Sequence, residues 1–347
     1  MNVKKNLMSW ATGVAHGVDT VPSRAATVIV DHGADIDAVR NGDLVGPGTV
    51  LFVPEDAATE DAAAHLARRG AALFGYSGSA SVAGDEFSPN RDFYLELQTY
   101  GVAAFVSVIG PTVVRIADID DFESYLADAD AAHSAGQFAE FMTNPAVQLA
   151  DATAFGAYLG DDGPELRVFV GSDSVSTSPA GLSLGDPTTL LRDLRASWDS
   201  AQQSQDGAFA SCGVCTSQAV DSAARRAALE QRPWLAHYLD AVAALRDLRA
   251  RGIEDATVLG FGEEADPDNS RKAGEPVVLQ TTESAYLHDP RRNRTVEMPR
   301  LLAPAALAVT RGLDASETSD LESVRAVTTG LWTLGFGSAS DDLVGTR

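Results

Sequence analysis

Short apolar runs separated by polar breaks divide the chain into strands and helices from residue 25 onward. Residues 60–70 end on two arginines and a glycine, which predicts a helix that stops at Gly70. The stretch 92–119 is rich in β-branched and aromatic residues and is broken at Gly110-Pro111, so it predicts two or three strands. Three further apolar, β-branched runs also predict strands: residues 26–31, 49–53 and 71–76.

The middle of the chain is predicted to be mostly helical. Residues 120–141 predict a helix, and residues 166–178 predict a hairpin around a Ser-Asp-Ser turn. Helical sequence then extends from 187 to 252. Its clearest helix covers residues 233–251, where Pro suits the first position and Gly252 suits the position after the last turn. The apolar stripe of that helix consists of Leu235, Tyr238, Leu239, Val242 and Leu245.

We therefore predict an α+β multidomain protein, in which a mixed α/β N-terminal region precedes a C-terminal module of three strands and three helices. A polar linker over residues 263–274, which contains Pro267, Asn269 and Gly274, marks the main boundary. The predicted parts are a weakly ordered arm (1–24), a mixed α/β domain (25–160), a mostly helical α/β region (161–270), the module (276–336) and a tail (337–347).

The C-terminal module has the order βββααα. Its predicted strands are residues 276–282, 285–289 and 294–298, joined by a two-residue connection at Glu283-Ser284 and a turn at 290–293. Three helical pieces follow. The first carries the stripe Leu302, Ala305, Ala306 and Val309 and ends at Gly312; the second opens at Ser319 and Glu322; the third holds Leu331, Trp332 and Leu334.

Residues 277–314 resemble the PqqD-like RiPP recognition element; their sequence is VVLQTTESAYLHDPRRNRTVEMPRLLAPAALAVTRGLD. The shared features are a second strand that ends in an aliphatic-Asp-Pro turn, a third strand that ends near a proline, and an Ala-rich helix that closes on a glycine. The first helix departs from the family by beginning Arg300-Leu301-Leu302-Ala303-Pro304, and Gly330 falls where a regular third helix is expected. Placed at the end of a long acidic chain, the module looks most like the recognition proteins of daptide-type RiPP biosynthesis.

The resemblance implies that the C-terminal module is a winged helix-turn-helix and that the protein is a non-catalytic adaptor. Such a protein binds the leader of a ribosomally made precursor peptide and brings it to modifying enzymes, here an oxidoreductase, an aminotransferase and a methyltransferase. The leader would add as a strand to the third strand and lay apolar side chains against the last helix. The peptide-binding residues expected on this basis are Arg291, Arg292, Arg294, Thr295, Val296, Glu297, Met298, Val324, Thr328, Leu331 and Trp332.

Charge supports a peptide partner over other partners. The chain carries 49 acidic and 26 basic side chains, a net charge of −23. A field this negative repels phosphate, so we expect neither nucleic acid nor anionic membrane as a partner. The arginines at 291, 292 and 294 form a local positive patch that could attract an acidic leader. No apolar run is long enough for a membrane span or a secretory signal, which predicts a cytoplasmic protein.

The cysteine pair is the sharpest local chemical motif. Cys212 and Cys215, in the spacing Cys-x-x-Cys, could form a redox dithiol or part of a metal site. No second such pair exists in the sequence, and His237 is at best a third ligand. The alternative is that both are small structural residues of a buried region.

Other candidate motifs are weaker. Residues 75–79 approach the nucleophile elbow G-x-S-x-G but end in Ser79, and residues 260–265 match G-x-G-x-x-A with two carboxylates where a pyrophosphate would lie. The Asp118/Asp120 and Asp266/Asp268 pairs could chelate a cation, although such pairs also arise by chance in an acidic chain. Because no set combines nucleophile, base and oxyanion donors, we expect no enzyme and no cofactor. Two alternatives remain open: a peptide-modifying enzyme that uses the cysteine pair, and a structural subunit.

Overall fold

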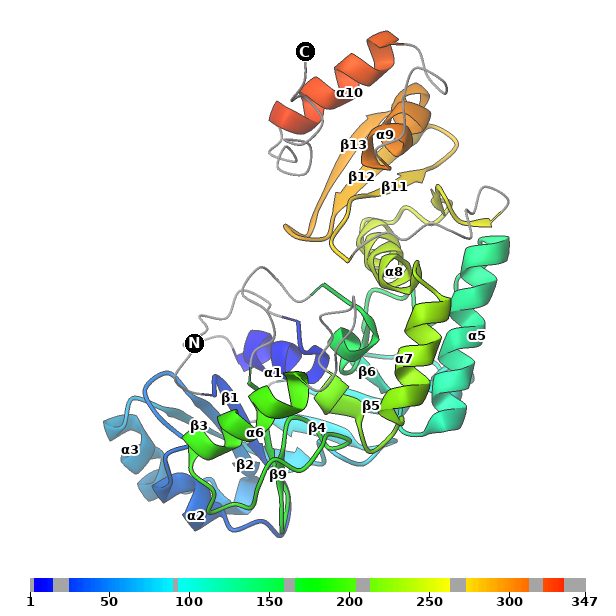
Figure 1. The fold of residues 1–347 in the computed structure, drawn as a ribbon. Coiled ribbons are helices and arrows are strands. Elements are labelled where there is room, and N and C mark those ends of the chain that lie inside the picture. The colour runs from blue at the N-terminus through cyan, green and yellow to red at the C-terminus, as the bar shows by residue number, and fades with distance from the viewer. Residues whose placement is uncertain are drawn as a thin grey trace. The chain divides into compact units, whose positions relative to one another are not determined.

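The computed structural model describes residues 3–14, 25–89, 93–158, 166–203, 213–262, 273–311 and 321–333. Within these ranges the protein is mixed α and β, with one large and one small sheet (Figure 1). The chain divides into two compact units. Unit 1 comprises Met1–Ala127 and Ala139–Arg232, and unit 2 comprises Asp128–Phe138 and Pro233–Arg347.

Unit 1 contains a nine-stranded sheet in the order β7-β6-β5-β4-β3-β2-β1-β8-β9. Only β4 and β9 run antiparallel to their neighbours; the other pairings are parallel. The strands are β1 (Thr27–Val30), β2 (Val50–Pro54), β3 (Ala72–Gly78), β4 (Glu86–Pro89), β5 (Leu95–Thr99), β6 (Thr112–Arg115), β7 (Val147–Leu149), β8 (Val168–Val170) and β9 (Val175–Ser176).

Helices connect these strands, as parallel pairing requires. The α-helices that lie in or begin in unit 1 are α1 (Val3–Thr12), α2 (Ile36–Asn41), α3 (Glu60–Arg68), α4 (Tyr100–Ala103), α5 (Ile119–Ala135), α6 (Leu191–Gln203) and α7 (Ser222–Gln231). Three short 3-10 turns are also present: η1 (Glu55–Ala57), η2 (Ala152–Phe155) and η3 (Gly213–Thr216). The predicted strands at 26–31, 49–53 and 71–76 and the helix at 60–70 are confirmed as β1, β2, β3 and α3.

The large sheet curls around α1. Trp10 of this helix donates a hydrogen bond from Nε1 to the carbonyl of Val168 on β8 at 3.1 Å. At the other end of the strand order, the backbone N–H of Asp151, just after β7, donates to the carbonyl of Ala11 at 2.9 Å. The helix α1 is therefore bonded to β8, which lies next to the end strand β9, and to the chain just after β7 at the opposite end of the sheet. The buried side chains of α1 belong to one apolar core with side chains from most of the strands: Ile29, Val50, Phe52, Tyr76, Phe87, Leu95, Leu97, Val113 and Phe169.

The opposite face of the sheet is covered by other helices. Alternate residues of a strand point to opposite faces, so Val28 and Val30 pack away from α1. They join a second core with α2, α3 and α6, to which Val39, Leu66 and Leu194 contribute. In Figure 1, α2 and α3 lie beside β1, β2 and β3.

Part of the first 24 residues is helical. Residues 1–24 were expected to form a weakly ordered arm, yet α1 occupies residues 3–12 with Leu7 and Trp10 buried. The sequence pattern gives little sign of this, because the partners of these side chains come from strands far along the chain. Residues 15–24 lie outside the described part. The two compact units meet in sequence at Arg232/Pro233, and Asp128–Phe138 belongs to unit 2.

Unit 2 contains a four-stranded antiparallel sheet in the order β10-β11-β12-β13. Its strands are β10 (Thr257–Val258), β11 (Val277–Gln280), β12 (Ser284–Asp289) and β13 (Arg294–Pro299). The described residues of unit 2 also form α8 (Leu235–Ala250), η5 (Arg300–Leu302), α9 (Ala303–Thr310) and α10 (Leu321–Thr333), and the unit includes the end of α5 from Asp128. The hairpin turn was predicted correctly: β12 ends at Asp289, and Asn293 takes a left-handed conformation with φ 46° just before β13.

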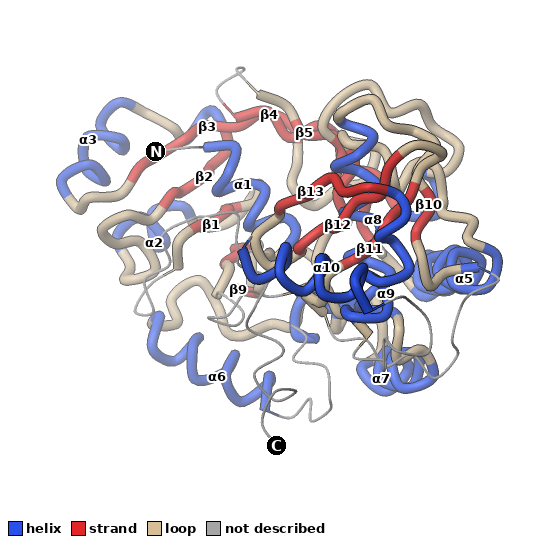
Figure 2. The backbone as a smooth tube through the Cα atoms, turned by 90° about the horizontal axis from the view of Figure 1, so that it is seen from above, coloured by secondary structure: helices blue, strands red, loops and turns tan. Residues whose placement is uncertain are grey.

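Helices flank this sheet on both faces. Val278, Ala285 and Leu287 pack with Ala305 of α9 and Val327 of α10. Figure 2 shows α9 and α10 side by side along these strands. On the other face, the carboxylate of Asp247 in α8 accepts a hydrogen bond from the hydroxyl of β13 residue Thr295. The strands of this module are thus held from two sides.

The predicted βββααα order needs correction. Three residues, not two, connect β11 and β12. Residues 331 and 332, expected in a third helix, continue α10, so the described part of the module has two α-helices after β13. The described elements establish a small antiparallel sheet with helices on it. They do not establish the more specific winged helix-turn-helix arrangement. Residues 312–320 and 334–347 lie outside the described part, as do 263–272 of the predicted linker.

Candidate functional site

The strand β13 forms an edge of the small sheet. Among the described strands it pairs only with β12, in the antiparallel register Ser284↔Pro299 to Asp289↔Arg294. An edge strand can accept a further strand through its outer backbone groups. The site expected from the sequence is therefore located on an edge, as strand addition requires.

The two faces of β13 have different chemistry. Residues directly opposite each other in an antiparallel pair share a face. Val296 pairs with Leu287 and Met298 pairs with Ala285, so both lie on the face that carries α9 and α10. Both side chains are only half-buried. This leaves apolar surface beside the strand edge.

The helix α10 lies next to this apolar surface. Val324 and Met298 are partly buried against the same core, so the structure brings these two predicted residues together. Thr328 is half-buried, and its hydroxyl donates to the carbonyl of Val324 at 2.8 Å within the helix. Leu331 and Trp332 belong to α10, but their side chains lie outside the described part.

The opposite face of β13 is polar. Thr295 pairs with His288, whose Nδ1 lies 2.9 Å from the threonine Oγ1. Glu297 accepts a hydrogen bond of 2.5 Å from the hydroxyl of Ser284. Thr295 and Glu297 thus join β13 to the rest of unit 2, and we assign them a structural part at the predicted site.

Two of the three predicted arginines hold the hairpin turn. Arg292 forms an ion pair of 2.9 Å with Asp289, whose side chain is 3% exposed. Arg291 donates from its backbone N–H to the other oxygen of Asp289, and from Nε to the carbonyl of Gly274 at 3.2 Å. All three arginines remain exposed, Arg294 included, so the positive patch is present at the surface.

The cysteine motif is oxidised and buried in the described part. Cys215, in η3, is disulfide-bonded and 0% exposed. The only other cysteine of the sequence, Cys212, lies outside the described residues. Among the described residues, no three His, Cys, Asp or Glu side chains are grouped as metal ligands.

The remaining motifs have structural explanations. Ser77 lies within β3, which continues through Gly78, so residues 75–79 do not form a strand-to-helix elbow. Asp118 accepts a hydrogen bond from the backbone N–H of Asp121 at 2.9 Å, in the first turn of α5. For the G-x-G-x-x-A match, Gly260 packs against the guanidinium of Arg311, and residues 263–265 lie outside the described part.

Comparisons with family models, with curated proteins and with solved structures found no match for this chain. In the part of the chain that is described, no helix combines the length and the apolar character needed to cross a membrane.

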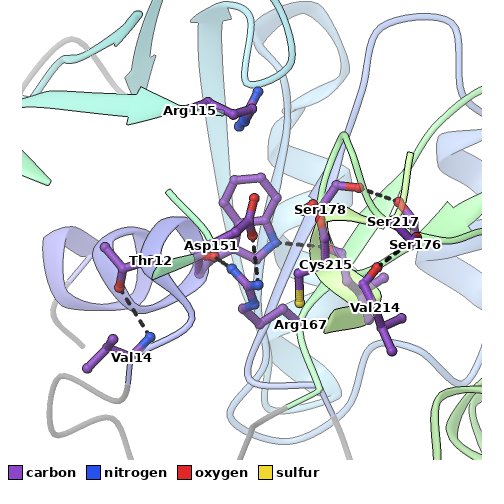
Figure 3. A network of polar contacts seen from close by, with 12 residues as sticks. Thr12, Val14, Arg115, Asp151, Arg167, Ser176, Ser178, Val214, Cys215 and Ser217 are labelled. Carbon is purple, nitrogen blue, oxygen red and sulfur yellow. Dashed lines mark hydrogen bonds and ion pairs between the residues drawn. The ribbon is translucent and has the colours of Figure 1, made fainter. Parts of the chain in front are cut away.

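A buried charged network in unit 1 was missed by the sequence reasoning. The guanidinium of Arg167 donates to Asp151 at 2.8 Å and to the carbonyl of Trp10 (Figure 3). Both partners of the ion pair are at least 95% buried. Nearby Arg115 is 9% exposed, and its burial lowers the pKa of its guanidinium, an effect that Asp151 opposes. Arg115 donates to the carbonyls of Ala80 and Ser81.

This network joins distant parts of the curled sheet. Asp151 follows β7, Arg167 precedes β8, and Trp10 lies in α1. One guanidinium therefore links the chain beside β7 and β8 to this helix. Figure 3 also shows the adjacent η3 segment, where the hydroxyl of Ser178 donates to the carbonyl of Cys215. The only sequence signal was a set of charged residues beside apolar strands.

Proposed function

We propose that this protein is a non-catalytic recognition adaptor that binds the leader of a ribosomally made precursor peptide along β13. The observation that carries the proposal is the exposed edge of β13 beside half-buried Val296 and Met298 and the helix α10. A peptide strand would pair with the outer backbone groups of β13 and place apolar side chains against Met298 and Val324.

The resemblance of residues 277–314 to the PqqD-like RiPP recognition element supports the same function. It adds to the proposal a winged helix-turn-helix arrangement of the module and a daptide-type setting. In that setting the bound precursor is delivered to modifying enzymes, including an oxidoreductase. The exposed arginines at 291, 292 and 294 favour an acidic leader, because they are local positive charges on a chain of net charge −23.

The test is binding of a fluorescein-labelled leader, taken from a precursor encoded beside the gene, to the full chain by fluorescence polarisation. Saturable binding near micromolar, about −8 kcal/mol, is expected from strand addition with a few buried anchors. Val296→Pro should weaken binding at least tenfold, because proline in the middle of β13 disrupts the geometry of the strand with which the leader would pair.

The matched control is Thr257→Pro, which places proline on β10, the opposite edge of the same sheet. It should leave leader affinity within about twofold. A second variant, Met298→Asp, leaves the backbone hydrogen-bonding groups of β13 intact and places a charge on its apolar face. It should also weaken binding of the leader. Equal affinity in Val296→Pro, Met298→Asp and the parent would overturn the proposal.

A further inference from the structure

Unit 1 exposes a group of large apolar side chains in the connection between β5 and β6. Phe105 is 89% exposed and Ile109 is 82% exposed. Nine large apolar residues are strongly exposed among the described residues. Four of them lie in this connection, Val102, Phe105, Val106 and Ile109, and a fifth, Ile119, begins α5 just after β6. We call these five residues the apolar loop patch. Contiguous exposed apolar groups of this kind mark interaction surfaces.

The fold explains why these side chains point outward. β5 and β6 are parallel, so the chain must cross back over the sheet between them. The crossover contains only α4, a helix of four residues, followed by a loop. Neither this short helix nor the loop can cover the sheet in the way that α3, which connects β2 and β3, covers it. The apolar residues of this connection therefore remain at the surface.

The loop is anchored at both ends. The backbone N–H of Gly101 donates to the buried carboxylate of Asp121 at 2.7 Å. At the other end, the carbonyl of Gly110 accepts from the hydroxyl of Thr112 at 2.9 Å, and a Cβ at Gly110 would lie 2.1 Å from the hydroxyl of Tyr94. A loop held in this way presents its side chains without a large ordering cost on binding.

Charge around the patch selects the partner. No charged residue lies between Glu96 and Arg115 in the sequence. Between residues 93 and 158 the only Lys or Arg is Arg115, and it is buried. The exposed charges that border the patch, on the first turns of α5, are all acidic: Asp118, Asp120 and Glu123. The hydrogen bond between Gly101 and Asp121 holds this acidic border beside α4.

We propose that the apolar loop patch docks a separate polypeptide that presents an apolar surface bordered by lysine or arginine. An anionic membrane would be repelled by the acidic border. A second copy of this chain would set two acidic borders against each other, which is unfavourable. A basic-rimmed protein surface satisfies both the apolar side chains and the carboxylates. This site lies in unit 1 and does not depend on peptide binding at β13.

The test uses a model of that chemistry, a fluorescein-labelled 14-residue peptide of leucine and lysine designed as an amphipathic helix. Fluorescence polarisation with the full chain should show saturable binding. The double variant Phe105→Ser/Ile109→Ser should bind at least tenfold more weakly, because it removes the two most exposed apolar side chains and changes no charge. Asp120→Asn/Glu123→Gln should weaken binding several-fold, and added salt should weaken binding to the parent.

The matched control is Val82→Ser/Leu182→Ser, which removes two exposed apolar side chains elsewhere in unit 1. It should bind as the parent does, whereas a scrambled peptide of the same composition should bind weakly to every form. Far-UV circular dichroism checks folding, and Ile109→Ser alone replaces the double variant if that variant unfolds. Equal loss in the control, or none in Phe105→Ser/Ile109→Ser, would overturn the proposal. So would binding of the parent to phosphatidylcholine/phosphatidylglycerol vesicles, or patch-dependent dimers in sedimentation velocity.

Discussion

The hydroxyl of Thr295 on the edge strand β13 lies 2.9 Å from Nδ1 of His288 on the neighbouring strand. The threonine donates its only proton to the carboxylate of Asp247 in α8, so the histidine must donate from Nδ1. This places a proton on Nδ1 of the imidazole. One chain of polar contacts therefore connects α8, β13 and β12.

The stability of unit 2 should decrease on acidification because of His288. Burial lowers the pKa of this side chain to about 4, although Asp247 and Asp289 oppose the shift. The unfolded chain therefore binds a proton between pH 6.5 and about 4 that the folded chain does not. The stabilisation from neutral His288, about 3 kcal/mol, is complete above pH 6.5 and is lost as the pH falls toward 4.

The measurement is urea unfolding of the parent and His288→Asn at pH 7.5, 6, 5 and 4. Asparagine can keep the donor toward Thr295 but does not titrate. The difference in unfolding free energy between the two proteins should shrink as the pH decreases. A difference that stays constant over this range would contradict a neutral, buried His288.

Loss of the buried ion pair in unit 1 should strongly destabilise the curled sheet. Arg167→Ala leaves the carboxylate of Asp151 buried without its partner and removes the donor to the carbonyl of Trp10. The expected cost is about 3–5 kcal/mol of unfolding free energy. Arg192→Ala, which removes the arginine of an exposed pair with Asp193, should cost less than about 1 kcal/mol. Urea unfolding followed by tryptophan fluorescence compares the two, and similar costs would contradict a special role for Arg167.

Local signals explain which elements the sequence predicted well. The β12–β13 turn follows from Asp289-Pro290 and from Asn293, a residue type that tolerates the left-handed conformation it adopts. The helix α8 ends where Gly252 takes φ 79°. Each of these signals lies within a few residues of the structure it sets.

Long-range contacts explain what the sequence did not predict. Trp10 is buried because its indole reaches Val168, which is distant in sequence, and no pattern near Trp10 reports that pairing. Arg167 belongs to a residue type that is usually exposed, so its burial could not be expected from its type. The apolar run 102–109 was predicted to be part of the strands, yet Phe105 and Ile109 lie in the loop after the short helix α4 and are exposed.

The turn before β13 should depend on the residue at position 293. Asn293 has φ 46°, in the region where residues with a Cβ are strained and where asparagine is tolerated. Asn293→Ala should therefore destabilise the protein by about 1 kcal/mol, whereas Asn293→Gly should be neutral or stabilising. Thermal unfolding of the three proteins provides the measurement. A less stable glycine variant would show that the asparagine side chain, and not the backbone conformation, is what the turn requires.

The two cysteines should not react with thiol reagents in the native protein. Cys215 is disulfide-bonded and fully buried, and the chain has two cysteines. Iodoacetamide should therefore add no mass to the folded, unreduced chain, and two carbamidomethyl groups after reduction in denaturant. Closing so short a loop stabilises by about 2 kcal/mol, so Cys215→Ser should lower the free energy of unfolding by about that amount. A native chain that reacts without reductant, while keeping its stability in Cys215→Ser, would instead favour an accessible dithiol and the enzymatic alternative.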